Sequence, residues 1–388
     1  MAEAALKTVK PNGHNPLFGD SDDTDMRDIM SRCALVFGRS DFKYYGFDSL
    51  DFNTVWQTGN KSIEKYNNID KIPPSFNNAF LADSGNYILR ENQTNTSNYL
   101  LFHNGYTGAG HAHADKLHFD LMIKGRDVLI DAGRYTYLNN AQRRYIKSPK
   151  AHNVCLIDNK QYLNVSSQWE TKNPAMAVQY PCFDNEYCTL IGGAHLGYLK
   201  SRNAFVERKI LYIKPDIYVI VDVFKAKGFH TYQQYFHFAP TGKTTISAKN
   251  AQFDDGIVKA NMHFVTPNAK IKKEDSIYSS NYNAICKNDC IKSSFSAFGN
   301  TSLITVIYGN TEENFVPYDV SFEQIKTARS EKTLPFSKAQ GVVIKTPEKE
   351  YTVCLAFKEL KEPFGCNNKI GSGTIGVFEN DKLIFTKW

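Results

Sequence analysis

Histidine and carboxylate residues gather in one stretch of the chain, between His111 and His152. His111 and His113 are two residues apart, so on an extended backbone their side chains project to the same face. Asp131 stands at the end of the second arm of a predicted hairpin, and His152 stands at the start of the next predicted strand. Neighbouring strands of one sheet are therefore expected to bring these groups together.

Two imidazoles and one carboxylate make a ligand set suited to Zn²⁺, with a fourth position left to water. His118 and Asp115 are close enough in the sequence to orient such ligands through hydrogen bonds. A pair of histidines on a strand is, however, more often an ordinary surface pair. Residue types and spacing alone leave both interpretations open.

The elements that must position these groups are predicted to be strands. From residue 81 to 388, short apolar runs alternate with turn residues, and no long helical pattern intervenes. The run LMIKGRDVLI (121–130) predicts a hairpin, with Lys-Gly-Arg-Asp as its turn. The pattern predicts a mostly β protein with a large antiparallel sandwich, and a possible subdivision near residue 243.

The first 80 residues differ in character. Residues 1–45 read as helical, and residues 46–80 as a linker. Apolar side chains between Met26 and Phe37 recur at helical spacing, with Asp and Thr just upstream as candidate N-caps. Two short helices cannot bury such an apolar stripe alone, so we expect it to pack on the β region or on a separate partner.

Composition and charge limit the class of protein. The net charge is +6, which suits an acidic partner such as a uronic-acid polysaccharide or a nucleic acid. The basic residues are scattered with no long run of Lys and Arg, so we expect no nucleic acid partner. The 22 Tyr and 26 Phe residues favour strands, and exposed aromatic rings can stack on sugars.

Targeting signals are not evident. The N-terminal residues MAEAALKTVKPNG contain no apolar core of a signal peptide, and no run of 18 apolar residues occurs. We therefore expect no membrane span, and the sequence itself leaves a cytoplasmic location open.

An ordered series of motifs resembles a known family. HAHAD (111–115), LIDAGRYTY (129–137) and R-x-Y-x-K-S-x-x-AHN (143–153) resemble the C-terminal β domain of heparinase II/III-like polysaccharide lyases. VERKILYIKPDIYVIVDVF and YQQYFHFAP are similar to the continuation of that domain, and GDSDD (19–23) resembles the end of the family's helical (α/α) toroid. The resemblance covers roughly residues 15–240 and implies that the first helices are what remains of a toroid.

The resemblance implies roles for individual residues. Carried over by position, the metal ligands are His113, Asp131 and His152, and the metal is a mainly structural Zn²⁺. The catalytic residues are His111 and Tyr137, and the substrate-binding residues are Tyr135, Arg143 and His237. Tyr135 is the less favoured of the two tyrosines, which share one face if the segment is a strand. His237 has an alternative interpretation, as a histidine satisfied within the sheet.

The activity that the resemblance implies is β-elimination on an acidic polysaccharide such as a glycosaminoglycan or alginate. The family's carboxylate-binding Asn and its toroid Tyr have no counterpart before His111, so the chain resembles a lyase without its first half. A non-catalytic module that binds glycan, or assembles with a separate toroid chain or with itself, is the alternative. Metal-dependent hydrolysis is a further one. The resemblance also implies a bacterial protein that is secreted or belongs to the periplasm or cell envelope.

Overall fold

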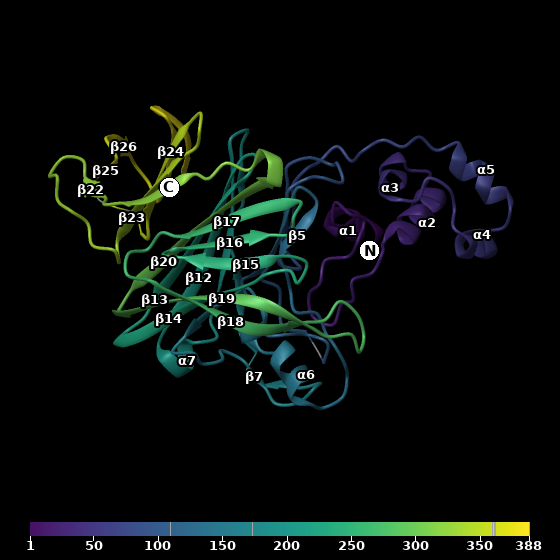
Figure 1. Cartoon of the computed structure of the whole chain (residues 1–388), viewed down its shortest axis with the longest axis horizontal. Helices are drawn as coiled ribbons and strands as arrows, with labels where there is room; N and C mark the ends of the chain where they lie inside the picture. Colours follow the sequence, from purple (N-terminus) through teal and green to yellow (C-terminus); the bar gives the residue numbers. More distant parts are fainter. Residues whose placement is uncertain (109, 173, 359, 361, 388) are drawn as a thin grey trace.

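The computed structural model describes residues 1–108, 110–172, 174–358, 360 and 362–387. Strands take up 43% of the chain and helices 14%, which confirms the mostly β prediction. Figure 1 shows the N-terminal helices at one end, the large sheets in the middle and the C-terminal strands at the other end. None of the helices in the described ranges is long and apolar enough to cross a membrane.

The N-terminal residues form a helical arm. It consists of α1 (Ala2–Thr8), α2 (Arg27–Phe37), α3 (Ser40–Tyr45), α4 (Phe52–Thr58) and α5 (Lys61–Asn67). The segment expected to be a linker therefore carries α4 and α5. Asp51 accounts for the start of α4, because its carboxylate accepts a hydrogen bond from the Thr54 N–H at 3.0 Å.

Helix α2 buries only part of its apolar stripe. Met30 and Ala34 are fully buried in a small core with Leu6, Phe42 and Tyr66, which come from α1, α3 and α5. The expected side-chain N-cap is not observed, whereas Gly38 ends the helix in the left-handed conformation. The helices of the arm thus cover one another along one side of α2.

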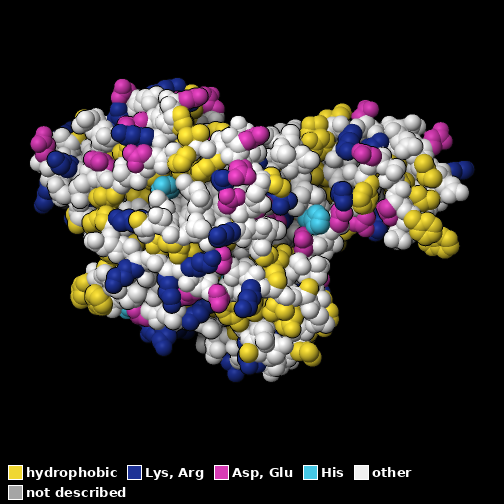
Figure 2. All heavy atoms as spheres, in the orientation of Figure 1, with side chains coloured by type: hydrophobic (Ala, Val, Ile, Leu, Met, Phe, Trp, Pro, Cys, Tyr) yellow, Lys and Arg dark blue, Asp and Glu magenta, His cyan; other side chains and the backbone are white. Residues whose placement is uncertain are grey.

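Several large apolar side chains of the arm remain exposed. Val36 and Phe37 at the end of α2, and Phe52 and Trp56 on α4, are between 58% and 79% exposed. Figure 2 shows apolar side chains gathered at the outer end of the arm, while charges of both signs are interspersed over the rest of this face.

Within the described residues the strands form three stacked layers of antiparallel sheets. The first layer contains a five-stranded and a four-stranded sheet. The five-stranded sheet has β1 (Ala79–Leu81), β2 (Asn86–Arg90), β3 (Tyr99–His103), β4 (His118–Ile123) and β5 (Arg126–Leu129). The four-stranded sheet has β6 (Cys155–Ile157), β14 (Phe229–His237), β18 (Lys270–Tyr278) and β19 (Cys286–Phe298). The predicted hairpin is confirmed as β4 and β5.

A nine-stranded sheet forms the central layer. Its members are β9 (Ala177–Gln179), β10 (Phe183–Asp184), β11 (Cys188–His195), β12 (Phe205–Ile213), β13 (Ile217–Lys225), β15 (Lys243–Ser247), β16 (Asn250–Asp254), β17 (Val258–Phe264) and β20 (Thr301–Thr311). Because β13 pairs with β20, strands from both sides of residue 243 share this sheet, and the possible subdivision near that residue matches no sheet boundary.

The third layer comes from the C-terminal residues. It contains β21 (Asp319–Glu323), β23 (Ala339–Lys345), β24 (Glu350–Ala356), β27 (Ile375–Glu379) and β28 (Lys382–Lys387). Smaller elements complete the described chain: α6 (Ala141–Ile146), η1 (Pro149–Ala151), β7 (Asn164–Val165), β8 (Thr171–Lys172), α7 (Leu199–Arg202), η2 (Glu312–Asn314), β22 (Lys326–Thr327), β25 (Phe364–Cys366) and β26 (Lys369–Gly371).

The central sheet is buried on both faces, which explains the nearly continuous apolar sequence of β13. Side chains alternate along a strand, so Tyr218 and Ile220 pack towards the first layer while Val219 and Val221 pack towards the third.

A buried ion pair interrupts this apolar pattern on the face towards the first layer. Arg208 on β12 lies directly opposite Asp222 on β13, and Nε and Nη2 donate to its two carboxylate oxygens at 2.6 and 2.8 Å. Nη1 donates to the backbone carbonyls of Leu117 at 2.7 Å and Asn153 at 2.5 Å. Arg208 thereby links the central sheet to the two loops that precede β4 and β6.

Replacing Arg208 should destabilise the protein strongly. In Arg208→Met the Asp222 carboxylate stays buried without its cation, and we expect the free energy of unfolding to fall by about 3–5 kcal/mol. Urea unfolding measures this change. Lys345→Met, which removes an exposed ion pair with Glu350, should cost at most about 1 kcal/mol. The double variant Arg208→Met/Asp222→Leu should recover part of the loss, and an equal loss in both would contradict this account.

Candidate active site

Three buried side chains, which come from separate segments near the β4–β5 hairpin, lie close together. His113 lies in the loop before β4, Asp131 follows β5, and His152 follows η1. One potential ligand atom from each residue lies within 4.8 Å of the other two. The structure therefore brings together the three residues expected to bind a metal.

The hydrogen bonds of this His–Asp–His cluster suit a divalent cation. His152 Nδ1 is 2.7 Å from Asp131 Oδ2, and His113 Nε2 is 2.9 Å from Asp20 Oδ1. The other ring nitrogens, His113 Nδ1 and His152 Nε2, are buried without a hydrogen-bond partner among the described residues. Asp20, which is not a member of the cluster, fixes the proton on His113 Nε2, so His113 Nδ1 presents a lone pair, the usual arrangement of a metal-binding histidine. Asp131 is itself a member of the cluster, and its 2.7 Å contact with His152 Nδ1 brings two potential ligand atoms together.

A second ring of hydrogen bonds holds the cluster in place. Asn153 N–H donates to His118 Nδ1 at 3.0 Å, and His118 Nε2 lies 2.9 Å from Asp120 and 3.5 Å from Asp131. His118 thus contacts a cluster residue, as expected. Asp115 instead lies beside His103, with 3.8 Å between Asp115 Oδ1 and His103 Nε2.

Asp20 is a site residue that the sequence analysis missed. It lies between α1 and α2, and its buried carboxylate accepts hydrogen bonds from His111, His113 and Arg143. Burial alone would raise the pKa of Asp20, but the hydrogen bonds from His113 and Arg143 outweigh burial and hold that pKa well below its usual value. The motif GDSDD contained this residue, but no local pattern showed what it would contact.

Gly19 allows Asp20 to lie close to the backbone of His111. Its φ is +57°, and a Cβ at this position would lie 2.9 Å from the His111 carbonyl oxygen. The adjacent Asp20 N–H donates to the same oxygen at 3.1 Å. The N-terminal segment is therefore fastened directly to the His111 backbone.

Arg143 does not have the position expected of a substrate-binding residue. It is fully buried, and its two terminal nitrogens donate to the two oxygens of Asp20 at 2.5 and 2.8 Å. The two terminal nitrogens of the Arg143 guanidinium are thus both bound to the Asp20 carboxylate. Arg143 positions Asp20, and through it the two histidines.

His111 and His113 do not share one face, contrary to the expectation. The segment before β4 is a turn-rich loop in which Leu117 has a positive φ, so the alternation of a strand does not apply. His113 is fully buried, whereas the side chain of His111 is 68% exposed. His111 Nδ1 is 2.9 Å from Asp20 Oδ2, which leaves Nε2 facing solvent.

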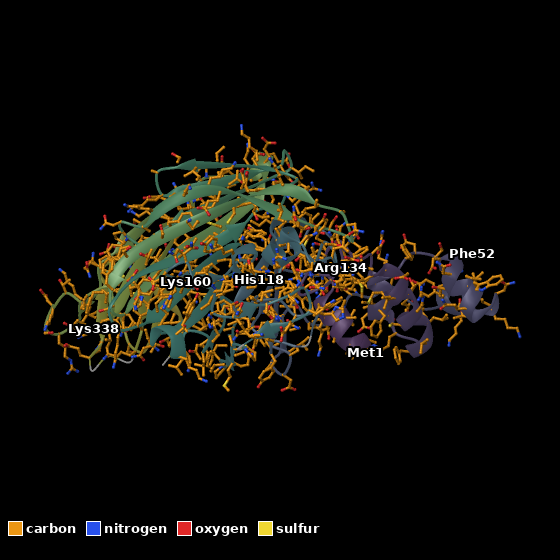
Figure 3. All side chains as sticks on the ribbon, turned by 90° about the horizontal axis from the view of Figure 1, so that it is seen from below. Met1, Phe52, His118, Arg134, Lys160 and Lys338 are labelled. Atoms are coloured by element: carbon orange, nitrogen blue, oxygen red, sulfur yellow. The ribbon has the colours of Figure 1, made fainter. Side chains whose placement is uncertain are left out.

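Tyr137 lies beside His111. Its hydroxyl oxygen is 3.5 Å from His111 Nδ1 and accepts a hydrogen bond from Arg134 Nη1 at 2.8 Å. Arg134 is held by Asp22 through two hydrogen bonds of 2.7 and 2.6 Å. In Figure 3 the labelled Arg134 lies where the helical arm meets the β region. A guanidinium donor at this position stabilises negative charge as it develops on the phenol oxygen.

Tyr135 lies apart from this pair. The segment after β5 is irregular, so the two tyrosines do not share the face of a strand. Tyr135 has a φ of +62° and packs against a small core with Ala132, Ile146 and Ala151. The structure therefore distinguishes the two tyrosines that spacing could not.

His237 does not reach a substrate surface. It is buried at the end of β14, with Nδ1 3.1 Å from Ser276 and Nε2 3.6 Å from the thiol of Cys290. Burial lowers the pKa of His237 to about 3, so the ring is neutral. Its position matches the alternative of a histidine satisfied within the sheet.

Trp169 and Tyr282 are further residues that the sequence analysis missed. The Trp169 ring stacks on Tyr137 with centroids 4.6 Å apart, and it meets His111 edge-on at 5.4 Å. Tyr282 lies 5.7 Å from Tyr137, and both Trp169 and Tyr282 are more than 40% exposed. With His111 and Tyr137 they form an exposed aromatic surface. The high aromatic content indicated only that exposed rings could stack on sugars, and it gave no place for them.

Comparisons with known proteins identify relatives in sequence and in fold. The chain is 24% identical over 198 residues to a heparin-sulfate lyase of Pedobacter heparinus, which covers 48% of this chain and 27% of that protein. The structure is similar to the crystal structure of the heparan sulfate lyase HepC from Pedobacter heparinus, with a TM-score of 0.73 and 16% identity over 93% of this chain and 53% of the other. A crystal structure of heparinase III gives a TM-score of 0.72 and 13% identity over 92% and 54%.

The chain thus spans about a quarter of the length of the curated relative and about half of that of the solved structures. The similarity to the solved structures establishes the fold. The family is established by sequence, because residues 73–307, more than half of the chain, match the model of the heparinase II/III-like C-terminal domain. The chain belongs to the heparinase II/III-like family.

Proposed function

We propose that this chain takes part in β-elimination on a uronic-acid-containing polysaccharide, with His111 and Tyr137 as the groups that transfer protons. The observation that carries the proposal is the position of His111, which is exposed, anchored to Asp20 through Nδ1, and adjacent to Tyr137. The names of the relatives, heparin-sulfate lyase and heparan sulfate lyase, support a sulfated glycosaminoglycan as the substrate.

The reaction needs a base and an acid. The base removes the proton from C5, the C4–O4 bond breaks, a C4–C5 double bond forms, and the departing O4 takes a proton. Asp20 holds the Nδ1 proton of His111, so Nε2 has a lone pair to accept the C5 proton. Tyr137 can donate its hydroxyl proton to O4, and Arg134 then stabilises the phenolate. Trp169 and Tyr282 offer faces on which sugar rings can stack.

We propose zinc as the metal of the His–Asp–His cluster, held by His113, Asp131 and His152. Bound there, it would supply a positive charge that ties three loops together. Asp20 links His113 to His111, so a fixed cluster also fixes the exposed histidine. Its role in this proposal is structural.

A non-catalytic assembly module is the second candidate. The exposed Phe37, Phe52 and Trp56 of the helical arm favour it, because apolar surface gathered at one end of a domain is typical of an interface. This candidate expects no elimination product from the chain.

Substitutions at His111 and Tyr137 test the catalytic proposal. His111→Ala and Tyr137→Phe should each slow formation of the unsaturated product by about 10²–10⁴-fold, because each removes a proton-transfer group. Ultraviolet absorbance of the product from heparan sulfate or alginate measures the rate. Tyr135→Phe, the matched control two residues away, should keep the wild-type rate. No product from the folded, zinc-loaded wild type on any uronate polymer would reject catalysis by this chain and favour the assembly module.

Substitution of the histidines tests the metal. His113→Ala and His152→Ala should lower bound zinc to near zero. Removing zinc from the wild type should reduce its free energy of unfolding by roughly 3 kcal/mol, compared with the wild type at a free zinc concentration about 100 times Kd. Elemental analysis and urea unfolding give the two values. His230→Ala is the control, because His230 forms a similar 2.8 Å contact with Asp158 outside the cluster. Stoichiometric zinc in His113→Ala or His152→Ala would refute the assignment.

A further inference from the structure

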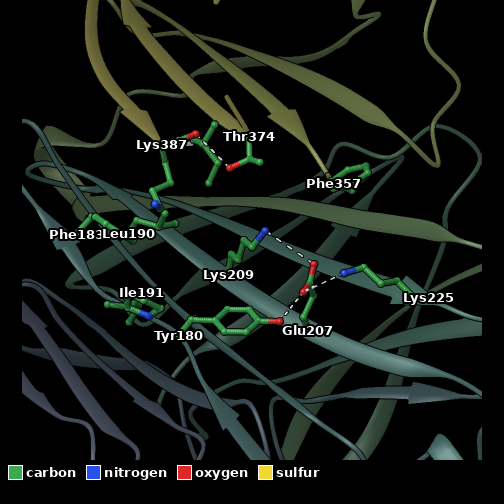
Figure 4. Close-up of a pocket in the computed structure, with 13 residues that line it drawn as sticks. Tyr180, Phe183, Leu190, Ile191, Glu207, Lys209, Lys225, Phe357, Thr374 and Lys387 are labelled. Carbon is green, nitrogen blue, oxygen red and sulfur yellow. Dashed lines mark hydrogen bonds and ion pairs between the residues drawn. The ribbon is translucent and has the colours of Figure 1, made fainter. Parts of the chain in front are cut away.

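A cavity of about 240 Å³ lies between the central sheet and the C-terminal layer. Its floor comes from β10, β11, β12 and β13, and its far wall from residues of β27 and β28 and from the residue that follows β24 (Figure 4). Side chains alternate along β12, so Glu207 and Lys209 face this cavity while Arg208 faces the first layer. The cavity therefore lies on the opposite face of the central sheet from the contacts that Arg208 makes with the loops of the site, and it shares no lining residue with that site.

Positive charge exceeds negative charge in the lining of this cavity. Lys209, Lys225 and Lys387 line it together with one carboxylate, Glu207. The ammonium groups of Lys209 and Lys225 are 3.8 and 3.6 Å from Glu207, beyond direct hydrogen-bond distance. Both ammonium groups thus keep donors for another acceptor, and Figure 4 shows them on either side of Glu207.

The positions of these groups are fixed by their neighbours. Tyr180 donates a hydrogen bond to Glu207 at 2.6 Å, which holds the carboxylate at the cavity wall. Gly192 lies directly opposite Lys209 in the sheet, and a Cβ there would lie 2.6 Å from the Arg208 carbonyl oxygen and 3.3 Å from Lys209 Cγ. A side chain at position 192 would therefore force the backbone of β12 to shift, so the place of Lys209 depends on this glycine.

Aromatic and apolar faces complete the lining. Tyr180, Phe183 and Phe357 contribute rings, and the Lys387 ammonium lies 4.2 Å from the centre of the Phe183 ring. The cavity thus combines an excess of ammonium donors with flat apolar walls. A ligand that fits both has an anionic group attached to a compact ring with apolar faces. Its volume is below the range of pockets for drug-sized ligands, which suits a single ring.

We propose that this cavity is a second glycan-binding site, which takes one carboxylate- or sulfate-bearing sugar unit. The source of the sugar rests on the proposed function, since an acidic polysaccharide that is cleaved near His111 also offers anionic units elsewhere along its length. Lys209 and Lys225 bind the anionic group, and the aromatic walls contact the ring. Binding at two separate sites on one polymer raises the effective affinity of the chain for long substrates.

Chemical acetylation of lysines tests the site in the intact protein. A sulfated heparan sulfate disaccharide at about ten times its Kd should slow acetylation of Lys225 by about tenfold, because bound ligand shields the ammonium group. Mass spectrometry of peptides gives the rate at each lysine. Lys345 is the matched control, because it is similarly exposed, lies 3.6 Å from Glu350, and stands at the opposite end of the C-terminal sheet from Phe357. Its acetylation should not change.

A variant gives the second measurement. Lys225→Gln should weaken disaccharide binding at this site by about tenfold, because one charge-assisted hydrogen bond is lost, whereas Lys345→Gln should bind as the wild type does. Lys225 is 46% exposed, so the substitution leaves the core intact. Equal protection of Lys225 by an uncharged disaccharide or by inorganic sulfate alone would overturn the proposal, as would unchanged binding in Lys225→Gln.

Protection of Lys225 tests the second binding site independently of the proposed catalysis at His111. His111→Ala should retain full protection of Lys225, since the cavity shares no residue with the His111 site. Protection without any elimination product would support the binding site and reject the proposed catalysis. An elimination product without protection of Lys225 would support the proposed catalysis and reject the second binding site.

Discussion

The guanidinium of Arg208 is the contact on which the arrangement of the site depends. One edge of it is neutralised by Asp222 within the central sheet, and Nη1 binds the carbonyls of Leu117 and Asn153. A buried cation is costly unless its donors are satisfied, so this arginine is stable only when both loops occupy their places. Since His113 and His152 belong to those loops, the central sheet determines where the two histidines stand. Asn153 also links this loop to the five-stranded sheet, because its side-chain amide donates hydrogen bonds to the backbone carbonyls of Phe119 and Ile130.

From this buried pair, a series of carboxylate–histidine contacts leads to the surface. Asp131 orients His152 inside the His–Asp–His cluster, and Asp20 orients His113 and the exposed His111 with its two oxygens. Asp20 accepts a hydrogen bond from one ring nitrogen of each of its two histidines and so decides which nitrogen has the lone pair. In His113 that nitrogen is buried without a hydrogen-bond partner among the described residues, and in His111 it faces solvent. The same carboxylate thus orients one buried and one exposed histidine.

The sequence was sufficient for those features that local pattern controls. The β4–β5 hairpin and the antiparallel sheets were predicted, because alternation and turn residues determine strands. The grouping of His113, Asp131 and His152 was implied by the family resemblance, since all three residues lie in loops to which strand alternation does not apply. Asp20 was not, because it contacts His111 from 91 residues away and no local pattern encodes that approach. The resemblance implies a substrate-binding role for Arg143, and its contact with Asp20, 123 residues away, is likewise not encoded in any local pattern. Tyr135 and Tyr137 could not be distinguished until the positive φ of Tyr135 was known.

Strand β12 shows how one element serves two unrelated surfaces. Arg208 faces the first layer, where it organises the loops of the site, and its neighbours Glu207 and Lys209 face the basic cavity. Because side chains alternate along a strand, a shift of one residue in register would exchange these roles and place Lys209 against Asp222. Pairing with β13 along its full length, and with β11 from Val206 to Ile213, prevents such a shift. The burial of the central sheet on both faces is therefore what allows two polar sites to be built back to back, each held by the register of the same strand.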